Sequence, residues 1–349
     1  MTTSSTSKPK ILRIGKIEFG TKKWEELGKV AEVIDCTSKD REEFFKDLKN
    51  KYSGVTCITR TFASVSQTGR FDEELSQHLP ESVRSVSHTG AGYDQIDVEP
   101  FTKKGIQISN VTTPVEAPTA DTAVFLVLAT TRNFQQGHDL AVQGKWPKDK
   151  CAGAKLGHEP EGKTLGIYGM GGIGRAIHNR LKPFNYGKII YHNRSQLKPE
   201  LENGAEYVSF DSLLSDSDII LISVPLNGNT RHSINAETIS KMKDGVVLIN
   251  TARGAVVNEA ELIKCLQSGK VGAYGSDVFE HEPEVPQVLL DMPNVVSLPH
   301  MGTHTYESIK NLEDFVVENV FDFLYTGKVK TIVPEQYSLQ IKEGPILSK

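Results

Sequence analysis

The sequence is poor in cysteine and has no cluster of positive charge. Its 349 residues include four cysteines, which are widely spaced and form no Cys-x-x-Cys pair: Cys36, Cys57, Cys151 and Cys265. This pattern disfavours a zinc site or a disulfide framework and favours a reducing compartment, so we predict no bound metal. The formal net charge of -4 and the scattered lysines give no support for binding to nucleic acid or to an anionic membrane.

Long apolar runs are also missing. The longest, Ala123–Ala129, is far shorter than the roughly 20 residues that a membrane-spanning helix needs. The polar N-terminal stretch MTTSSTSKPK lacks the apolar core of a secretory signal, and we predict residues 1–9 to be a disordered lead. Together these absences predict a cytoplasmic protein that does not bind a membrane.

Short β-rich runs alternate with helical patterns along the whole chain, which is typical of parallel α/β architecture. The chain is also long enough for two domains. Strands are predicted in the first half at Ile11–Gly15, Val30–Asp35, Val55–Thr59, Val83–Ser87 and Ile106–Val111. Helices are predicted between them at Lys22–Lys29, Lys39–Asn50, Phe71–Leu79 and Val98–Lys104. In the second half, strands are predicted at Thr164–Tyr168, Lys188–Tyr191, Ile219–Val224, Val246–Asn250, Gly272–Ser276 and Val295–Leu298.

We therefore predict two doubly wound parallel-sheet domains with a cleft between them. The first is a flavodoxin-like substrate domain, and the second is a Rossmann dinucleotide-binding domain with strand order 3-2-1-4-5-6. A long helix at Thr119–Phe134 begins the second domain, and an amphipathic helix at Glu307–Leu324 returns to the first. Its apolar stripe is predicted to pack in the core and consists of Ile309, Leu312, Val316, Val320 and Phe323. The predicted substrate domain is thus discontinuous, at residues 1–113 and 303–349, around a dinucleotide domain at 114–302.

A glycine-rich turn lies between the first strand and first helix of the second domain. It reads Gly169-Met170-Gly171-Gly172-Ile173-Gly174, a G-x-G-x-x-G. In this setting the glycines permit a tight turn, close packing of helix on strand, and the approach of backbone N–H groups to a pyrophosphate at a helix N-terminus. The turn predicts a dinucleotide site.

The end of the next strand bears on the choice of dinucleotide. An NAD-specific site uses an Asp or Glu there to bind the ribose 2′-hydroxyl. Here the strand runs into His192-Asn193-Arg194-Ser195, which has no acid and offers a cation where a 2′-phosphate would lie. We predict a preference for NADP(H), with NAD(H) as the alternative cofactor.

Three side chains near strand ends form a complete set for reducing a 2-oxo acid. The Arg253 guanidinium suits a planar carboxylate, His300 can transfer a proton near neutral pH, and Glu282 can orient that histidine and stabilise its charged form. Each also has a simpler interpretation when taken alone. Arg253 could be a surface charge, Glu282 part of a solvated acidic run, and His300 a hydrogen-bonded core residue.

Several motifs together make the sequence resemble the D-isomer-specific 2-hydroxyacid dehydrogenases, and most closely the fungal glyoxylate and hydroxypyruvate reductases. The motifs are HTGAGYDQID (88–97), TADTAVFLVL (119–128), GMGGIGR (169–175), NTARGAVV (250–257), SDVFEHEP (276–283) and LPHMGT (298–303). The resemblance implies that Arg253 binds the substrate carboxylate and carbonyl, that His300 is the acid/base and that Glu282 is its partner. It further implies carboxylate binding by the backbone N–H groups of Ala91 and Gly92 and cofactor contacts from Thr119 and Asp277. Pro225 and Thr251 are also assigned to the cofactor site.

The predicted reaction is the reduction of a small 2-oxo acid, such as glyoxylate or hydroxypyruvate, to the D-2-hydroxy acid. Two alternatives stay open: a dehydrogenase for bulkier 2-oxo acids, and a non-catalytic, nucleotide-sensing protein like the corepressors that share this fold. The resemblance also implies a homodimer formed through residues 119–146. Because the predicted substrate groups fall in both domains, we expect closure about hinges near Val111–Pro114 and Gly302–Thr305.

Overall fold

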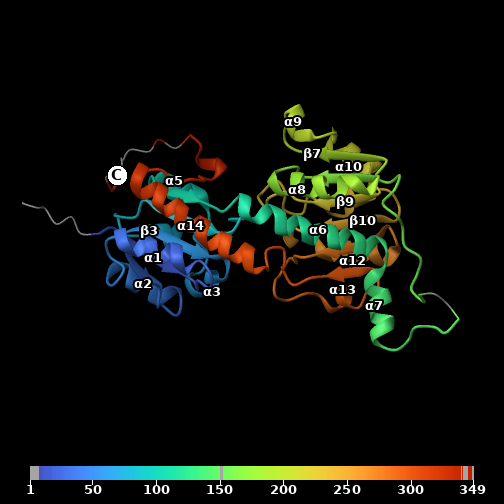
Figure 1. Ribbon diagram of the computed structural model, residues 1–349, viewed down its shortest axis with the longest axis horizontal. Helices are drawn as coiled ribbons and strands as arrows, with labels where there is room; N and C mark the ends of the chain where they lie inside the picture. The colour runs from blue at the N-terminus through green and yellow to red at the C-terminus, as the bar shows by residue number, and fades with distance from the viewer. Residues whose placement is uncertain (1–7, 150–151, 339, 341–344, 348–349) are drawn as a thin grey trace, which may run out of the picture. The chain divides into compact units, whose positions relative to one another are not determined.

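The computed structural model describes residues 8–149, 152–338, 340 and 345–347, and it divides into two compact units (Figure 1). Unit 1 consists of Met1–Val115 and Thr305–Lys349, and unit 2 of Glu116–His304. Most of the predicted disordered lead, residues 1–7, lies outside the described residues, as does Cys151. Pro9, however, is buried and its carbonyl accepts the N–H of Glu32 at 2.9 Å, so ordered contacts begin earlier than predicted.

Unit 1 is built on a five-stranded parallel sheet in the order β2-β1-β3-β4-β5, which confirms the flavodoxin-like arrangement. Residues of the middle strands are buried on both faces, which explains why they read as β-branched runs rather than as alternating patterns. The strands are β1 (Lys10–Ile14), β2 (Glu32–Asp35), β3 (Val55–Thr61), β4 (Ser85–Thr89) and β5 (Gln107–Ser109). At the carboxyl edge Thr61 of β3 pairs with Thr89 of β4, so the segments that follow these strands begin side by side.

Helices cover both faces of this sheet. They are α1 (Thr21–Val30), α2 (Arg41–Lys49), α3 (Val65–Thr68), α4 (Glu73–His78), α5 (Val98–Lys103) and α14 (Tyr306–Thr326). The C-terminal helix α14 belongs to unit 1, as predicted, and packs beside α1; its apolar stripe is buried except for Ile309, which is half-buried. Helix α4 begins two residues later than predicted because Asp72 caps it, accepting the N–H of Leu75 at 2.9 Å.

A buried carboxylate joins α14 to the start of α1. Glu313 of α14 accepts hydrogen bonds from three consecutive backbone N–H groups: those of Glu18 at 2.8 Å, Phe19 at 2.8 Å and Gly20 at 2.6 Å. These donors belong to the segment that leads into α1, so Glu313 fixes the start of that helix from a position about 300 residues away in the sequence.

Unit 2 is built on a seven-stranded parallel sheet in the order β12-β11-β10-β9-β6-β7-β8. Its strands are β6 (Thr164–Tyr168), β7 (Lys188–His192), β8 (Glu206–Tyr207), β9 (Ile219–Ile222), β10 (Val246–Asn250), β11 (Val271–Ser276) and β12 (Val295–Ser297). The Rossmann architecture and the strand order 3-2-1-4-5-6 are confirmed, with a seventh strand added, but the third strand was misassigned. The third strand of the sheet is β8, which the prediction missed, and the predicted third strand is β9, which pairs with β6. A two-residue strand is too short to show an alternating pattern.

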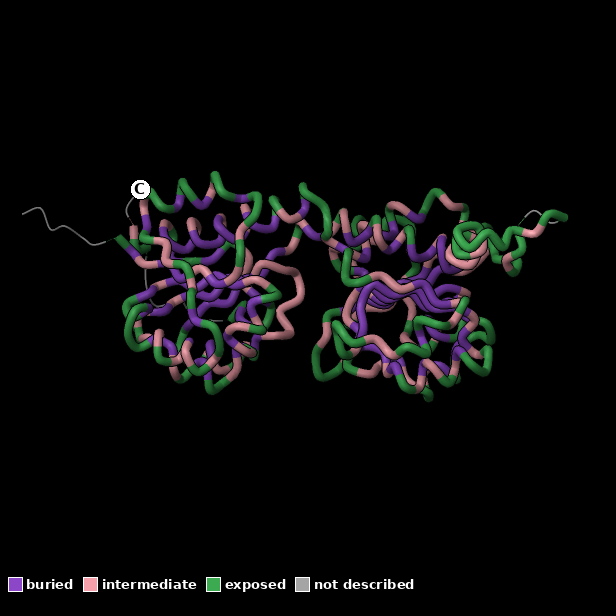
Figure 2. The backbone as a smooth tube through the Cα atoms, turned by 90° about the horizontal axis from the view of Figure 1, so that it is seen from below, coloured by how far each residue is buried: buried purple, intermediate pink, exposed green. Residues whose placement is uncertain are grey.

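The helices of unit 2 also lie on both faces of its sheet, with the strands buried between them (Figure 2). They are α6 (Glu116–Thr131), α7 (Phe134–Val142), α8 (Gly172–Leu181), α9 (Pro199–Glu202), α10 (Phe210–Asp216), α11 (Ala236–Ser240), α12 (Glu259–Ser268) and α13 (Gln287–Leu290). The predicted helix Thr119–Phe134 corresponds to α6, which begins earlier and ends at Thr131, and the separate helix α7, which follows the left-handed Asn133 (φ 53°), was not predicted. No helix in the described part of the chain is long and apolar enough to span a membrane.

Candidate active site

The glycine-rich turn connects β6 to α8 and leaves no room for side chains at two positions. Gly169 has φ of 99°, and a Cβ there would lie 2.7 Å from the backbone of Ser223 and Val224. A Cβ on Gly174 would lie 2.2 Å from the carbonyl oxygen of Gly169. Gly171 differs, since a Cβ there would meet nothing within 4 Å. The backbone at Gly171 is therefore open, as a pyrophosphate site requires.

Asn193 fastens this turn to the end of β7. Its side-chain Oδ1 accepts the N–H of Met170 at 2.7 Å, and its own carbonyl accepts the hydroxyl of Tyr207 at 3.1 Å. The two residues that follow, Arg194 and Ser195, are exposed. Of the three residues at this strand end, Asn193 thus holds the glycine-rich turn, and Arg194 and Ser195 face solvent.

The other residues assigned to the cofactor differ in environment. Gly172 and Ile173 are half-buried at the first turn of α8, and Pro225 is exposed just after β9. Thr251 is buried after β10, and its hydroxyl has no hydrogen-bond partner within the described ranges. A buried hydroxyl without a partner is costly, so this atom is suited to meet a ligand group. With the open backbone at Gly171, these residues fit a dinucleotide.

Arg253 follows β10 and is held by its neighbours. The amide of Asn250 bridges the turn, since Nδ2 donates to the carbonyl of Arg253 at 3.0 Å and Oδ1 accepts the N–H of Ala252 at 3.0 Å. Next along the chain, Gly254 lies so close to the following loop that a Cβ would be 1.9 Å from the carbonyl carbon of Phe279. The segment that carries Arg253 is therefore packed directly on the segment that carries Glu282.

Glu282 and His300 form the predicted pair. Nδ1 of His300 lies 2.8 Å from Oε2 of Glu282, and the other carboxylate oxygen accepts the N–H of Phe279 at 2.9 Å. Burial opposes ionisation of Glu282. The hydrogen bond and charge of His300, the N–H of Phe279 and the charge of Arg253 outweigh it, so the pKa of Glu282 lies below its ordinary value. The histidine and glutamate side chains remain 34% and 27% exposed, so Nε2 can face a substrate.

Asp277 fixes the backbone that carries His300. This buried residue follows β11, and its backbone carbonyl accepts the N–H of His300 at 2.8 Å. Its carboxylate accepts the next two N–H groups, those of Met301 at 2.6 Å and Gly302 at 2.7 Å. Burial raises the pKa of Asp277 above its ordinary value, although these hydrogen bonds oppose the shift. Thr119 lies beside the same loop, about 3.5 Å from a Cβ placed on Gly302.

A second histidine–glutamate pair lies next to the first and was missed by the sequence analysis. Nε2 of His232 lies 2.5 Å from Oε1 of Glu280, two residues before Glu282. The N–H of Glu280 donates to the buried carboxylate of Glu259 at 2.7 Å, and burial raises the pKa of Glu259. The sequence offered only an acidic run at 280–284, with no sign of which acid faces which histidine.

Ala91 and Gly92 lie in unit 1, in the loop that follows β4, and both are half-buried. The structure therefore brings Arg253, Glu282, His300, Asp277 and Thr119 into one region of unit 2 and places the predicted carboxylate donors in unit 1. No group of three or more metal-ligating side chains occurs among the residues with described positions.

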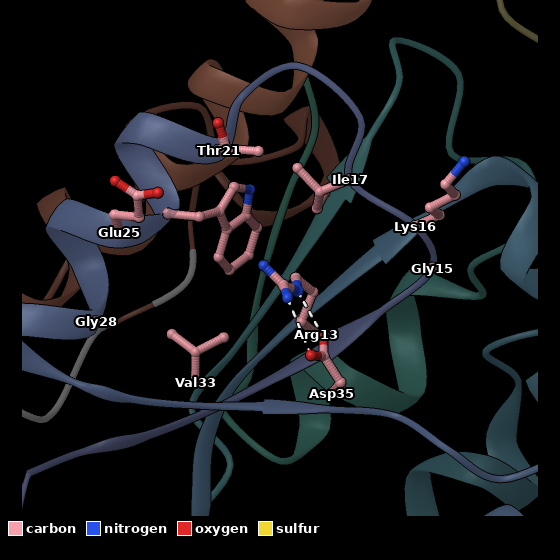
Figure 3. A pocket seen from close by; sticks show the side chains of 10 residues that line it. Arg13, Gly15, Lys16, Ile17, Thr21, Glu25, Gly28, Val33 and Asp35 are labelled. Carbon is pink, nitrogen blue, oxygen red and sulfur yellow. Dashed lines mark hydrogen bonds and ion pairs between the residues drawn. The ribbon is translucent and has the colours of Figure 1, made fainter.

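Unit 1 also has a cavity of about 530 Å³ beside α1 (Figure 3). Arg13 and Asp35 line it as a two-pronged ion pair, with N–O distances of 2.6 and 3.0 Å, and the guanidinium lies 4.8 Å from the ring centroid of Trp24. None of the predicted site residues lines this cavity, so we assign it no part in the reaction.

Unit 2 defines the class of protein. It is a Rossmann domain with a glycine-rich turn after β6 that fits a dinucleotide, and with the Glu282–His300 pair after the neighbouring strands β11 and β12. Within this class, residues 124–302 match the NAD binding domain of the D-isomer specific 2-hydroxyacid dehydrogenases. The chain belongs to this family, as the sequence motifs predicted, and its cofactor is a nicotinamide dinucleotide.

Similar proteins agree with this assignment over almost the whole chain. Glyoxylate reductase 1 of Saccharomyces cerevisiae is 53% identical, with 99% of each chain covered. 4-Methyl-2-oxopentanoate reductase A of Aspergillus oryzae is 45% identical, with 94% of this chain and 98% of that protein covered. Among solved structures, the NADPH-dependent glyoxylate/hydroxypyruvate reductase of Sinorhizobium meliloti, in complex with NADP and malonate, has a TM-score of 0.83 at 30% identity, covering 97% of this chain and 100% of the other.

Proposed function

We propose that this protein reduces a small 2-oxo acid to the D-2-hydroxy acid, with His300 as the proton donor. The observation that carries the proposal is the Glu282–His300 pair, held at 2.8 Å in the dinucleotide domain of this family. When bound, the reduced nicotinamide supplies the hydride that the carbonyl carbon accepts. The carbonyl oxygen takes its proton from Nε2 of His300, because Nδ1 is engaged by Glu282.

The remaining residues bind and orient. Arg253 offers its guanidinium to the substrate carboxylate and carbonyl, and its charge also favours the ionised form of Glu282. The N–H groups of Ala91 and Gly92 bind the carboxylate. Asp277 holds the His300 loop through its carboxylate, and a contact with the nicotinamide is assigned to this residue and to Thr119.

Glyoxylate and hydroxypyruvate are the proposed substrates. The yeast and Sinorhizobium proteins support this choice by their names, while the Aspergillus protein acts on a branched 2-oxo acid. We therefore keep bulkier 2-oxo acids as the second candidate. NADP(H) is the proposed cofactor, because the end of β7 has the exposed cation Arg194 and no acid from Tyr191 to Ser195.

The test is turnover of purified protein with each reduced nicotinamide against glyoxylate, hydroxypyruvate and 4-methyl-2-oxopentanoate, with the chirality of the last two products determined. We expect oxidation of NADPH with glyoxylate and a D-product from the larger acids. His300→Ala is the matched inactive control, with a loss of roughly a hundred- to ten-thousand-fold. A protein that binds NADPH but turns over none of these acids would instead support the corepressor-like, non-catalytic alternative.

A homodimer and a cytoplasmic location complete the proposal. Five large apolar side chains are exposed within one stretch of unit 2: Phe125, Phe134, Val142, Trp146 and Leu156. Such a concentration is unusual for a surface that faces only water, and it supports association of two chains there. The cytoplasmic location is supported by the sparse, widely spaced cysteines.

A further inference from the structure

Unit 1 contains a buried cation that the proposed reaction does not use. Arg60, in β3, is 0% exposed. Its Nη2 donates to Oε1 of Gln95 at 2.6 Å, its Nε lies 3.4 Å from Oγ of Ser64, and its guanidinium lies 5.2 Å from the ring centroid of Phe71. Burial lowers the pKa of Arg60 to about 10, with Asp94 opposing the shift, so the group stays charged at neutral pH.

This cation is poorly explained by stability alone. A buried charge is costly unless its hydrogen bonds are complete. Nη1 of Arg60 has no acceptor among the residues that the structure describes. An apolar side chain of similar size would avoid that cost. The role of Arg60 therefore lies in the groups that its Nη2 and Nε hold in place.

What they hold is the loop that carries Ala91 and Gly92. Gln95 belongs to this loop, and Ser64 follows β3, the strand next to β4. The fork of Arg60 therefore ties the segment after β3 to the segment after β4, from the inside of the unit. In the same loop, the backbone of Gln95 accepts the N–H of Phe71 at 3.0 Å.

The other supports of the loop share one property: they leave the two proposed carboxylate donors free. Nδ2 of Asn110 donates to the carbonyl of Ala91 at 2.7 Å, and the N–H of Val111 donates to the carbonyl of Gly90 at 2.9 Å. No described group accepts from the N–H of Ala91 or of Gly92. These contacts and the Gln95 side chain therefore hold the loop without engaging the N–H groups of Ala91 and Gly92.

We propose that Arg60 is a positioning residue for substrate binding: through Gln95 it fixes the 90–97 loop so that the N–H groups of Ala91 and Gly92 meet the substrate carboxylate. This inference rests on the proposed function. A misplaced pair of donors weakens binding of the oxo acid, whereas the dinucleotide site and His300 lie in unit 2 and keep their own supports.

The test compares Gln95→Leu, Gln95→Glu and Arg60→Met with the wild type. Gln95→Leu removes the acceptor, and we expect the KM for glyoxylate and the inhibition constant of oxamate to rise on the order of tenfold, with kcat and NADPH affinity nearly unchanged. Gln95→Glu retains an acceptor for Arg60 and should keep both constants near the wild-type values. Arg60→Met should match Gln95→Leu, and the double variant should be no worse than either.

Arg13→Met is the matched control in the same unit. Arg13 also pairs with a side-chain oxygen and lies over an aromatic ring, but it contacts Asp35 and Trp24 rather than the 90–97 loop (Figure 3). The Arg13→Met variant should therefore have the same KM for glyoxylate as the wild type. If Arg60→Met does not fold, Gln95→Leu carries the test, because Gln95 is only half-buried.

Two results would overturn the inference while the proposed function stands: an unchanged KM in folded Gln95→Leu, or an equal loss in Gln95→Glu. A third result would assign Arg60 a purely structural role. In that case NADPH affinity and thermal stability would fall together, while the KM for glyoxylate would change no more than in Arg13→Met. Absence of turnover in the wild type would overturn the proposed function and this inference with it.

Discussion

At the scale of single residues, the most constrained position is His300. Its φ of 55° lies in the left-handed region, which costs a residue other than glycine about 1–3 kcal/mol. Asp277 offsets that cost by accepting the N–H groups of His300, Met301 and Gly302. Three hydrogen bonds to Asp277 thus hold the strained backbone, which places Nδ1 of the imidazole 2.8 Å from Oε2 of Glu282.

Replacing Glu282 with Gln should move the pH profile of reduction to lower pH. His300 lowers the pKa of Glu282, so the charged forms of the two groups stabilise each other. Gln lacks the negative charge that favours the charged form of the donor, so the activity that depends on the donated proton should fall earlier as pH rises. The measurement is kcat/KM for glyoxylate across pH. A profile identical to that of the wild type would show that the pair is not coupled in catalysis.

Replacing Arg194 with Ala should reduce the preference for NADPH over NADH by about tenfold to a hundredfold, since a hydrogen bond to a charged group is lost. The catalytic efficiency with NADH should hardly change. The loss of efficiency with NADPH should be smaller at high salt, because Arg194 is exposed. Arg175→Ala, on the neighbouring helix α8, is the control for a general loss of positive charge. If the ratio of catalytic efficiencies with NADPH and NADH is the same in wild type and Arg194→Ala, this strand end does not select the cofactor.

The proposed catalytic residues could be found in the sequence, but the residues that hold them in place could not. Arg253, Glu282 and His300 stand in recognisable motifs at strand ends. Asn193 was predicted as a cofactor-binding residue, but no sequence pattern indicates that its side chain also accepts the N–H of Met170. The pair of His232 with Glu280 joins residues 48 positions apart, and no local pattern indicates such a contact.

At the scale of helices and strands, Glu313 makes the clearest prediction. Glu313→Gln leaves one oxygen for three N–H donors and adds an amide donor that faces them, so we expect unit 1 to lose about 1–3 kcal/mol of stability. Amide hydrogen exchange at Glu18, Phe19 and Gly20 should accelerate most. Glu307→Gln, an exposed charge on the same helix, is the control and should change exchange there little. Unaltered protection of the three amides in Glu313→Gln would contradict the capping role.

Element prediction succeeded where patterns were long and failed where a single residue or a very short strand decided the outcome. Helix α14 was predicted to within two residues because its apolar stripe runs over many turns. The helix predicted at Thr119–Phe134 ends at Thr131, and α7, which follows the left-handed Asn133, was not predicted because no consistent sequence signal marks that division. Strand β8 has two residues, and missing it shifted the numbering of every later strand in the sheet.

At the scale of the whole molecule, the exposed apolar stretch of unit 2 predicts self-association. Wild-type protein should sediment as a dimer at micromolar concentration, and Trp146→Asp should shift it towards monomer by replacing one of these exposed apolar side chains with a charge. Tyr337→Asp is the control, since Tyr337 is an exposed aromatic residue in unit 1. Sedimentation velocity over a range of concentrations measures this. A monomeric wild type throughout that range would rule out the dimer.

The placement of the two tryptophans gives each unit its own optical reporter. Trp24 is 4% exposed in unit 1, beneath the guanidinium of Arg13, and Trp146 is 62% exposed in unit 2. Trp24 should emit at short wavelength and resist iodide, while Trp146 should emit at long wavelength and be quenched in the monomer but not in the proposed dimer, which covers it. Ultraviolet excitation of the unlabelled protein can therefore separate melting of one unit from events on the surface of the other. A single emission spectrum then reports two processes that enzyme assays would combine.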